Sequence, residues 1–160
     1  TNMGGILVVD GVRVGEALGR YYLKDQAAAR DHSGDGSIMT VLATDAPLSD
    51  RNLRRLAKRA IAGLARTGAS MTNGSGDYVI AFSTSDKVRR VASDGPRQIL
   101  DLPNDAMSPL FQAAAEATEE AILNSLFRAR DVRGHRGLVE ALPVDKVMRL
   151  WHQARREGRG

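Results

Sequence analysis

Eight consecutive residues, Ser37 to Thr44, constrain the fold more than any other part of this 160-residue chain. Most of their side chains are apolar or β-branched, which suits a strand covered on both faces. A helix is expected next, because Ser49 is a good N-cap and the apolar residues behind it recur at helical spacing until Thr67-Gly68. A second strand is expected over residues 78–84. This succession of strand, helix and strand is the framework for the remaining expectations.

Weaker patterns predict the elements on either side of this framework. Asp10-Gly11 is a hairpin-type turn signal, so two short strands are expected at about residues 5–9 and 12–14. A long helix is expected from Ser108-Pro109 to about residue 128, and a last helix from Pro143 through Trp151. Irregular structure is expected at residues 31–36, at 85–104 apart from a short strand near 98–100, and in a basic glycine loop at 130–137.

The composition favours a soluble globular chain and excludes several kinds of site. Hydrophobic residues make up 42% and charged residues 26% of the sequence, and no apolar run reaches the roughly 18 residues that a membrane helix needs. The chain has no cysteine, which excludes disulfides, thiolate metal sites and cysteine nucleophiles, and fits a reducing compartment such as the cytoplasm. His32, His135 and His152 show no metal-ligand spacing, so none of them is expected to bind a metal. No cofactor is expected.

A basic surface offers one alternative interpretation of function. The formal net charge is +4, and many of the arginines and lysines fall in residues 51–66 and 155–159. Such a patch could bind nucleic acid. A solvated helix face is the preferred interpretation, because aromatic residues are only 4% of the chain and offer few stacking platforms. No nucleic-acid partner is therefore expected.

The junction between Gly36 and Ser37 could carry chemistry. A glycine precedes a serine at the mouth of the expected strand, so no bulky side chain guards the peptide bond. The serine hydroxyl could attack the preceding carbonyl and shift the acyl group from nitrogen to oxygen, after which water would release it. The new chain would begin at Ser37, whose α-amine could act as a base because such amines titrate at about pH 7.7–8.0. The alternative is an ordinary Gly-Ser turn.

Three further polar residues could complete such a site. Ser75 and Asp77 lie just before the second strand, and if the two strands are parallel neighbours, their entrances share one edge of the sheet. Ser75 could then hydrogen-bond the Ser37 side, while Asp77 could orient Ser75 or hold an ammonium group. Asn2 could donate its side-chain amide to an oxyanion. The alternative is that all three are ordinary turn or chain-end residues.

Short blocks along nearly the whole chain carry a family resemblance, and they keep their order. They are Gly36-Ser37-Ile38 with Thr44-Asp45-Ala46-Pro47-Leu48, Leu53-Arg54-Arg55-Leu56-Ala57-Lys58-Arg59, Gly63-Leu64-Ala65-Arg66-Thr67-Gly68-Ala69, Asn73-Gly74-Ser75-Gly76-Asp77, Ile80-Ala81-Phe82-Ser83-Thr84, Glu119-Glu120-Ala121-Ile122-Leu123-Asn124-Ser125-Leu126 and Val139-Glu140-Ala141-Leu142-Pro143. Together they make the chain resemble the L-aminopeptidase/D-amidase and β-peptidyl aminopeptidase family, also called DmpA-like.

The resemblance implies an α/β fold, namely a four-layer αββα sandwich similar to that of the ornithine acetyltransferases, of which this chain would be a part. Members are made as one precursor that cuts itself, and here the cut would fall between Gly36 and Ser37. Residues 1–36 would be the end of the α chain and residues 37–160 the whole β chain. Both would belong to one structural domain whose upstream part lies outside this sequence.

The resemblance also implies a role for each site residue. Ser37 would be the nucleophile, and Ser75 would support it. Asp77 would be the acidic residue two positions on, where well-described members have glutamate. Asn2 would help to form the oxyanion hole.

We therefore expect a self-processing serine aminopeptidase/amidase that releases N-terminal residues from small peptides, amides or esters through an acyl-enzyme. Expected partners are a small peptide or amino-acid amide substrate, the upstream α-chain region and further αβ units in a homo-oligomer, with no nucleic acid and no membrane. An acyltransferase on the same scaffold is the first alternative, although relatives of that kind resemble a threonine nucleophile and this chain has Ser37. A non-catalytic basic binding protein and an inactive family member are the others.

Overall fold

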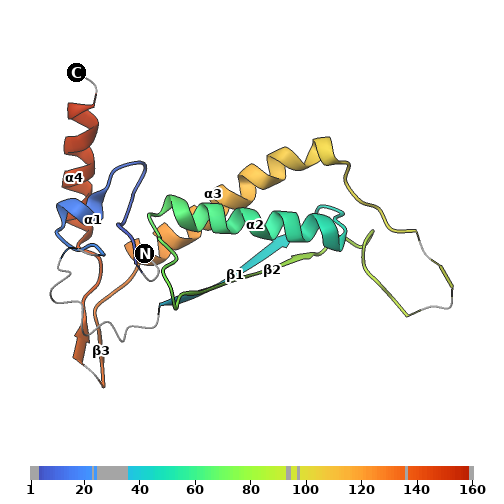
Figure 1. Ribbon diagram of the computed structural model, residues 1–160, viewed down its shortest axis with the longest axis horizontal. Coiled ribbons are helices and arrows are strands. Elements are labelled where there is room, and N and C mark those ends of the chain that lie inside the picture. The colour runs from blue at the N-terminus through green and yellow to red at the C-terminus, as the bar shows by residue number, and fades with distance from the viewer. Residues whose placement is uncertain are drawn as a thin grey trace.

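The computed structural model of the chain describes residues 4–22, 24, 36–92, 95–96, 98–135 and 137–158. Its elements, in chain order, are α1 (Val14–Ala17), β1 (Ser37–Thr44), α2 (Asp50–Arg66), β2 (Gly76–Ser83), the 3-10 helix η2 (Asn104–Ala106), α3 (Met107–Phe127), β3 (Val132–Gly134), β4 (Gly137–Val139) and α4 (Val144–Glu157). Figure 1 shows α2 and α3 as a helical layer on one side of the β1–β2 pair.

The strands β1 and β2 form a parallel pair that α2 connects. Their register runs from Ser37 opposite Gly76 to Thr44 opposite Ser83. Parallel neighbours need a crossover of this kind, because a tight turn can join only antiparallel strands. The predicted order of strand, helix and strand is confirmed, and the second strand begins two residues before the predicted start.

One face of the β1–β2 pair packs against the helices and the other face is exposed. Burial alternates along β1 and, from Asp77 onward, along β2, as the two-residue period of a strand requires. The large apolar side chains of the open face are exposed by 43–63%, and they are Met39, Val41, Tyr78, Ile80 and Phe82. The prediction of a strand covered on both faces does not hold within the described part of the chain, because its helices cover only one of them.

The helix-facing side of the sheet carries the main core. Leu48, Leu56, Met107 and Ala114 are buried there, and Leu42 of β1 packs against them. This cluster joins β1, α2 and the start of α3, so the apolar stripe of α2 lies against the sheet. Burial of such side chains stabilises the fold by about 25 cal/mol for each Å² of apolar surface removed from water.

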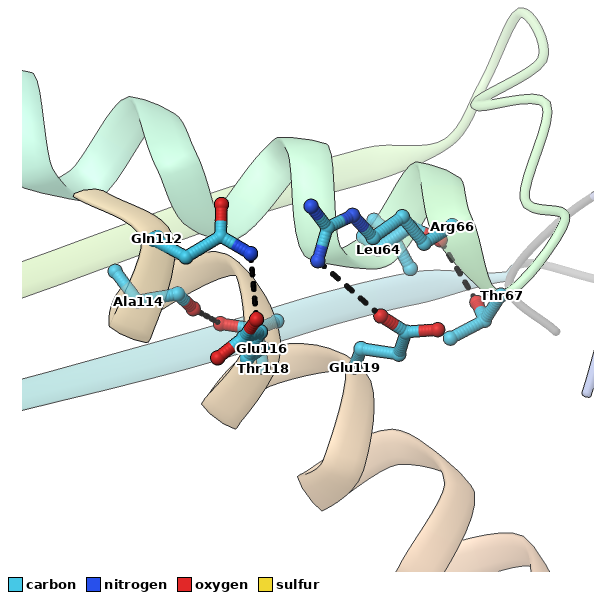
Figure 2. A network of polar contacts seen from close by, with 8 residues as sticks. All are labelled: Leu64, Arg66, Thr67, Gln112, Ala114, Glu116, Thr118 and Glu119. Atoms are coloured by element: carbon cyan, nitrogen blue, oxygen red, sulfur yellow. Dashed lines mark hydrogen bonds and ion pairs between the residues drawn. The ribbon is translucent and has the colours of Figure 1, made fainter. Parts of the chain in front are cut away.

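The helices α2 and α3 approach closely where α2 has a glycine. A Cβ on Gly63 would lie 2.3 Å from the carbonyl oxygen of Ala115 and 2.8 Å from the Cβ of Thr118. Figure 2 shows polar contacts beside this approach, among them an ion pair of 3.5 Å between Arg66 of α2 and Glu119 of α3. The absence of a side chain at residue 63 therefore sets the distance between the two helices.

The first turn of α2 is held by a compact polar cluster. The Ser49 hydroxyl accepts a hydrogen bond from the backbone N–H of Asn52 at 3.3 Å, which confirms the predicted N-cap. The Asp101 carboxylate accepts from the Ser49 N–H at 2.9 Å, from the Ser49 hydroxyl at 2.6 Å and from the Asn52 amide at 2.8 Å. Burial raises the pKa of Asp101, but these hydrogen bonds outweigh it and hold the pKa below the ordinary value of 3.8.

Residues 4–22 run along the end of α2. The N–H of Ile6 donates to the Gly68 carbonyl at 2.9 Å, and the N–H of Val8 donates to the Thr67 carbonyl at 3.0 Å. Gly5 and Gly68 both have positive φ, of 102° and 86°, and a Cβ on Gly5 would lie 2.0 Å from the Gly68 oxygen. Only glycine fits such a close approach of two backbones.

The predicted strands at residues 5–9 and 12–14 are wrong. The segment forms only isolated bridges, from Gly5 to Ala69 and from Val9 to Val12. Asp10-Gly11 does make the predicted tight turn, with φ of 47° and 80°. Pairing across the turn stops at Val9 and Val12, which exchange two backbone hydrogen bonds of 3.0 and 2.9 Å. The chain then enters the short helix α1 at Val14 instead of continuing as a strand.

Two segments in the second half of the chain differ from the prediction. Residues 130–137 were expected to be irregular, but β3 and β4 form an antiparallel hairpin there, and residues 98–100 form no strand. The helix α4 follows Pro143 as predicted and ends six residues later than Trp151. It buries Val147 against Leu7 and Val14, so the two ends of the described chain share a second apolar cluster.

Candidate active site

Ser37 is the first residue of β1, and its side chain is on the exposed face of the sheet. The register pairs Ser37 with Gly76, and it pairs Met39 with Tyr78 one step further along the same face. Gly36, directly before the strand, is half-buried. The peptide bond between Gly36 and Ser37 thus lies at the start of the strand, as predicted, and the Ser37 residue that follows it is exposed.

The parallel pairing brings the Ser75 side chain to this peptide bond. The Ser75 hydroxyl donates a hydrogen bond of 3.0 Å to the carbonyl oxygen of Gly36. The backbone N–H of Gly76 donates a hydrogen bond of 3.2 Å to the Ser37 hydroxyl oxygen. The predicted meeting of the two strand entrances at one sheet edge is therefore present. A hydrogen-bond donor lies beside the Ser37 hydroxyl oxygen, the possible nucleophile, and another lies beside the Gly36 carbonyl oxygen, the group that it could attack.

The turn before β2 presents Ser75 in this position. The N–H of Ser75 donates to the Thr72 carbonyl at 2.9 Å, and Gly74 has a φ of 93°, so the loop is also the ordinary turn that its composition suggests. Turn formation and contact with Gly36 are compatible, since the backbone of Ser75 makes the turn and its side chain makes the contact.

The structure does not bring Asp77 to the face of Ser37, and it does not describe Asn2. Asp77 lies opposite Ile38 in the register, so it belongs to the helix-facing side of the sheet, whereas Ser37 belongs to the exposed side. Its suggested task of orienting Ser75 stays a prediction. Asn2 lies outside the described residues, and its place in an oxyanion hole stays a prediction as well.

The comparisons with known proteins place the chain in a family. The model of peptidase family S58 matches residues 1–140. The chain belongs to peptidase family S58. A curated relative, the β-peptidyl aminopeptidase BapA of Sphingosinicella microcystinivorans, is 40% identical over 159 residues, which are 94% of this chain and 40% of the relative. This S58 chain therefore spans about two fifths of that relative's length.

Solved structures confirm the fold. The L-aminopeptidase D-Ala-esterase/amidase of Ochrobactrum anthropi, described as a variant of the Ntn hydrolase fold, matches with a TM-score of 0.76 and 32% identity, over 93% of this chain and 40% of that chain. A β-aminopeptidase of a Burkholderia species matches with a TM-score of 0.74 and 36% identity, over 92% of this chain and 40% of that one. The expected α/β sandwich of DmpA-like type, partial in this chain, is confirmed.

A groove follows β1 in the S58 chain. It has a volume of about 470 Å³, and its walls are residues 38–43 of β1 and one side of α3 from Ala117 to Ser125. No residue of β2 lines it, so it lies along the edge of β1 that faces away from β2. Within the described residues that edge has no neighbouring strand, since β1 and β2 form a two-stranded sheet.

Two residues near Ser37 were not singled out from the sequence. Gly76 supplies its backbone N–H, and Tyr78 lies one step along the face that carries Ser37. The signal for Gly76 was the Gly-Ser-Gly loop directly before a strand. Tyr78 had no signal, because its position depends on the register between strands.

Two kinds of site are not found in the part of the chain that the structure describes. No three histidine, aspartate or glutamate side chains gather there in a way that could hold a metal ion. Within the same ranges, no helix combines the length and the apolar character that crossing a bilayer requires. Independence from a cofactor stays a prediction.

Proposed function

We propose that this chain is part of a self-processing serine aminopeptidase/amidase, a hydrolase that releases N-terminal residues from small peptides, amides or esters. Residues 1–36 would be the end of its α chain and residues 37–160 its β chain. The observation that carries the proposal is the pair of contacts at the Gly36–Ser37 bond, from the Ser75 hydroxyl and the Gly76 N–H. Membership of family S58 and the names of the relatives support the same activity.

In the self-cleavage step, the Ser37 hydroxyl oxygen would attack the carbonyl carbon of Gly36. A C–O bond forms as the C–N bond breaks, and the nitrogen of Ser37 takes up the proton that the hydroxyl loses. Water then hydrolyses the ester. The Gly36 oxygen becomes negative during the attack, and the Ser75 hydroxyl that already donates to it can stabilise that charge.

In turnover, the Ser37 hydroxyl would attack the carbonyl of a substrate and form an acyl-enzyme. The new α-amine of Ser37, or Ser75 through a proton relay, would take the proton, because an α-amine titrates near neutral pH. Asn2 would donate to the oxyanion, and Asp77 would orient Ser75 or hold the substrate ammonium group. Water would then release the acyl group, with no metal or other cofactor in the route.

The nucleophile is tested by Ser37→Ala in the full-length protein. The variant should remain one chain and should not turn over amino-acid amides, whereas the unchanged protein should yield a new chain that begins at Ser37. Intact mass and N-terminal sequencing measure the first result, and release of ammonia or a chromogenic amine measures the second. A cut and active Ser37→Ala protein contradicts the proposal.

The support from Ser75 is tested by Ser75→Ala, with Ser83→Ala as the matched control. Ser83 makes a similar hydroxyl-to-carbonyl contact, of 2.7 Å to Ala46, at the other end of the same strand pair. Loss of one oxyanion donor costs about 10²–10³ in rate, so Ser75→Ala should slow cleavage of the Gly36–Ser37 bond by that order. In turnover the variant would lose the proposed proton relay, and since acid–base groups contribute about 10²–10⁴, that rate should fall as well. The Ser83 variant should keep both rates. Equal rates for the two variants remove Ser75 from the mechanism.

The remaining partners belong to the same proposal. We propose that the upstream α-chain region supplies a strand beside β1, in the groove of about 470 Å³ next to α3. Strand addition would satisfy the outer backbone groups of β1, which otherwise form an open sheet edge.

Several αβ units would assemble into a homo-oligomer, and the cytoplasm is the proposed compartment because the chain has no cysteine.

A further inference from the structure

The surroundings of Ser37 on its own sheet face contain few side chains. Alternation along a strand puts Ser37, Met39 and Val41 on one face, and the register puts Gly76, Tyr78 and Ile80 opposite them. Opposite Ser37 there is therefore only a glycine. The first bulky neighbours on this face are Met39 and Tyr78.

The ring of Tyr78 reaches back towards the nucleophile. The position that a Cβ on Gly76 would occupy lies 3.0 Å from the Ser37 hydroxyl oxygen and 3.1 Å from the ring atom Cε2 of Tyr78. Both atoms thus border the same small space above Gly76. The Tyr78 side chain is 63% exposed, so its ring stands on the open face and is not part of the core beneath the helices.

The chemistry of an acyl-enzyme fixes where a substrate residue must lie. The carbonyl carbon of the released residue is bonded to the Ser37 oxygen, so its side chain begins only a few bonds from that atom. Successive residues on one face of a strand are about 6.6 Å apart, which leaves Ile80 roughly 13 Å from the Ser37–Gly76 pair. Among the large side chains that β2 presents on this face, only that of Tyr78 stands within reach of a small acyl group.

We propose that Tyr78 is a specificity-determining residue, whose ring forms a wall of the pocket for the side chain of the released residue. The inference rests on the proposed function and deepens it, because it names the residue that limits the size of that side chain. The wall acts by steric exclusion: a side chain that extends over Gly76 meets the ring, and a shorter one does not.

The test uses the full-length, self-cleaved protein with Tyr78→Val and Tyr78→Phe. Valine keeps a strand-forming side chain and removes the ring, while phenylalanine keeps the ring and removes the hydroxyl. Ile80→Val is the matched control, on the same strand face but one step further from Ser37. The substrates are the 4-nitroanilides of alanine and leucine, and the readout is the ratio of kcat/KM for leucine over alanine.

Tyr78→Val should raise this ratio by about tenfold or more, since even one methylene group in a hydrophobic pocket changes selectivity by about 10–200-fold. Tyr78→Phe and Ile80→Val should leave it within twofold of the unchanged protein. A ratio unchanged in Tyr78→Val, or one that rises equally in Ile80→Val, overturns the role of Tyr78. If Tyr78→Val does not fold, Tyr78→Leu provides the same comparison. Failure of the proposed function is distinct, because the unchanged protein would then stay uncut and inactive on both substrates.

Discussion

The replacement Gly76→Ala tests how closely the nucleophile is held. The added Cβ would lie 3.0 Å from the Ser37 hydroxyl oxygen, 3.1 Å from Tyr78 Cε2 and 3.5 Å from the Ser37 Cβ. The first two contacts are shorter than ordinary van der Waals contact, so each neighbour must move by a few tenths of an ångström. The hydroxyl of Ser37 moves most easily, by rotation about its Cα–Cβ bond, and this rotation weakens its 3.2 Å hydrogen bond from the Gly76 N–H.

The expected result is a loss of rate without a comparable loss of stability. A misplacement of 1 Å costs about 100-fold in rate, so a shift of a few tenths should slow cleavage of the Gly36–Ser37 bond by about tenfold. Replacing glycine by alanine stabilises by about 0.4–1 kcal/mol through the unfolded chain, and the tight contacts offset a similar amount. The free energy of unfolding should therefore change by less than about 1 kcal/mol.

The assay follows intact mass during cell-free synthesis of the full-length protein, so that precursor and product are counted from the start. Gly134→Ala is the matched control, because it also lies in a strand and a Cβ there meets nothing within 4 Å. Urea unfolding of both variants checks their stability. Cleavage of the Gly76 variant at the rate of the Gly134 variant, with both folded, would refute the reasoning.

Two further perturbations address the scaffold. Gly63→Ala drives a methyl group into the carbonyl of Ala115 and should destabilise the protein by about 1–3 kcal/mol in urea unfolding, and an unchanged midpoint contradicts the close packing of α2 on α3. Asp101→Asn tests the pH dependence of stability. Because the pKa of Asp101 is lowered in the folded protein, its carboxylate contributes fully to the free energy of unfolding above about pH 5, and this contribution is lost as the pH falls through the folded pKa. The variant should therefore lose less stability than the unchanged protein between about pH 6 and pH 3, and parallel curves of unfolding free energy would contradict this.

The elements that the sequence predicted well are those in which local and tertiary preferences agree. The helix α2 has a serine cap, a clear apolar stripe and a glycine after its end, and all three act in the structure. The strands β1 and β2 were expected for the same reason. The open second face of β1 was not predictable. A strand that is apolar on both faces is expected to be covered on both, but its sequence does not say whether the covering elements lie within these 160 residues.

The two mispredicted segments failed for different reasons. Residues 5–9 look like a hairpin strand, but their backbone bonds to Gly68 and Thr67 at the end of α2. The hairpin of β3 and β4 has strands of only three residues, too short for a periodic pattern. The first case is decided by contacts about 60 residues away along the chain, and the second by a hairpin too short to show in the pattern.

The meeting of Ser37 and Ser75 was predictable from the sequence, whereas the faces on which Asp77 and Tyr78 lie were not. Ser37 and Ser75 could be named from their positions before two strands, and the structure brings them to the same peptide bond. The assignment of Asp77 to the opposite side of the sheet, and the nearness of Tyr78, follow from a register of Ser37 opposite Gly76. A register shifted by one residue would have placed Asp77 on the face of Ser37 and Tyr78 on the opposite face.

The attachment of residues 4–22 has a consequence for any protein cut before Ser37. That segment is bonded to the end of α2 through Ile6 and Val8, and its side chains share an apolar cluster with α4. None of these contacts involves the Gly36–Ser37 bond. The two pieces would therefore migrate together in native chromatography and separate only in denaturant. Cleavage would change the connectivity of the polypeptide and leave its packing as it was, so the new amine would appear in surroundings that are already assembled.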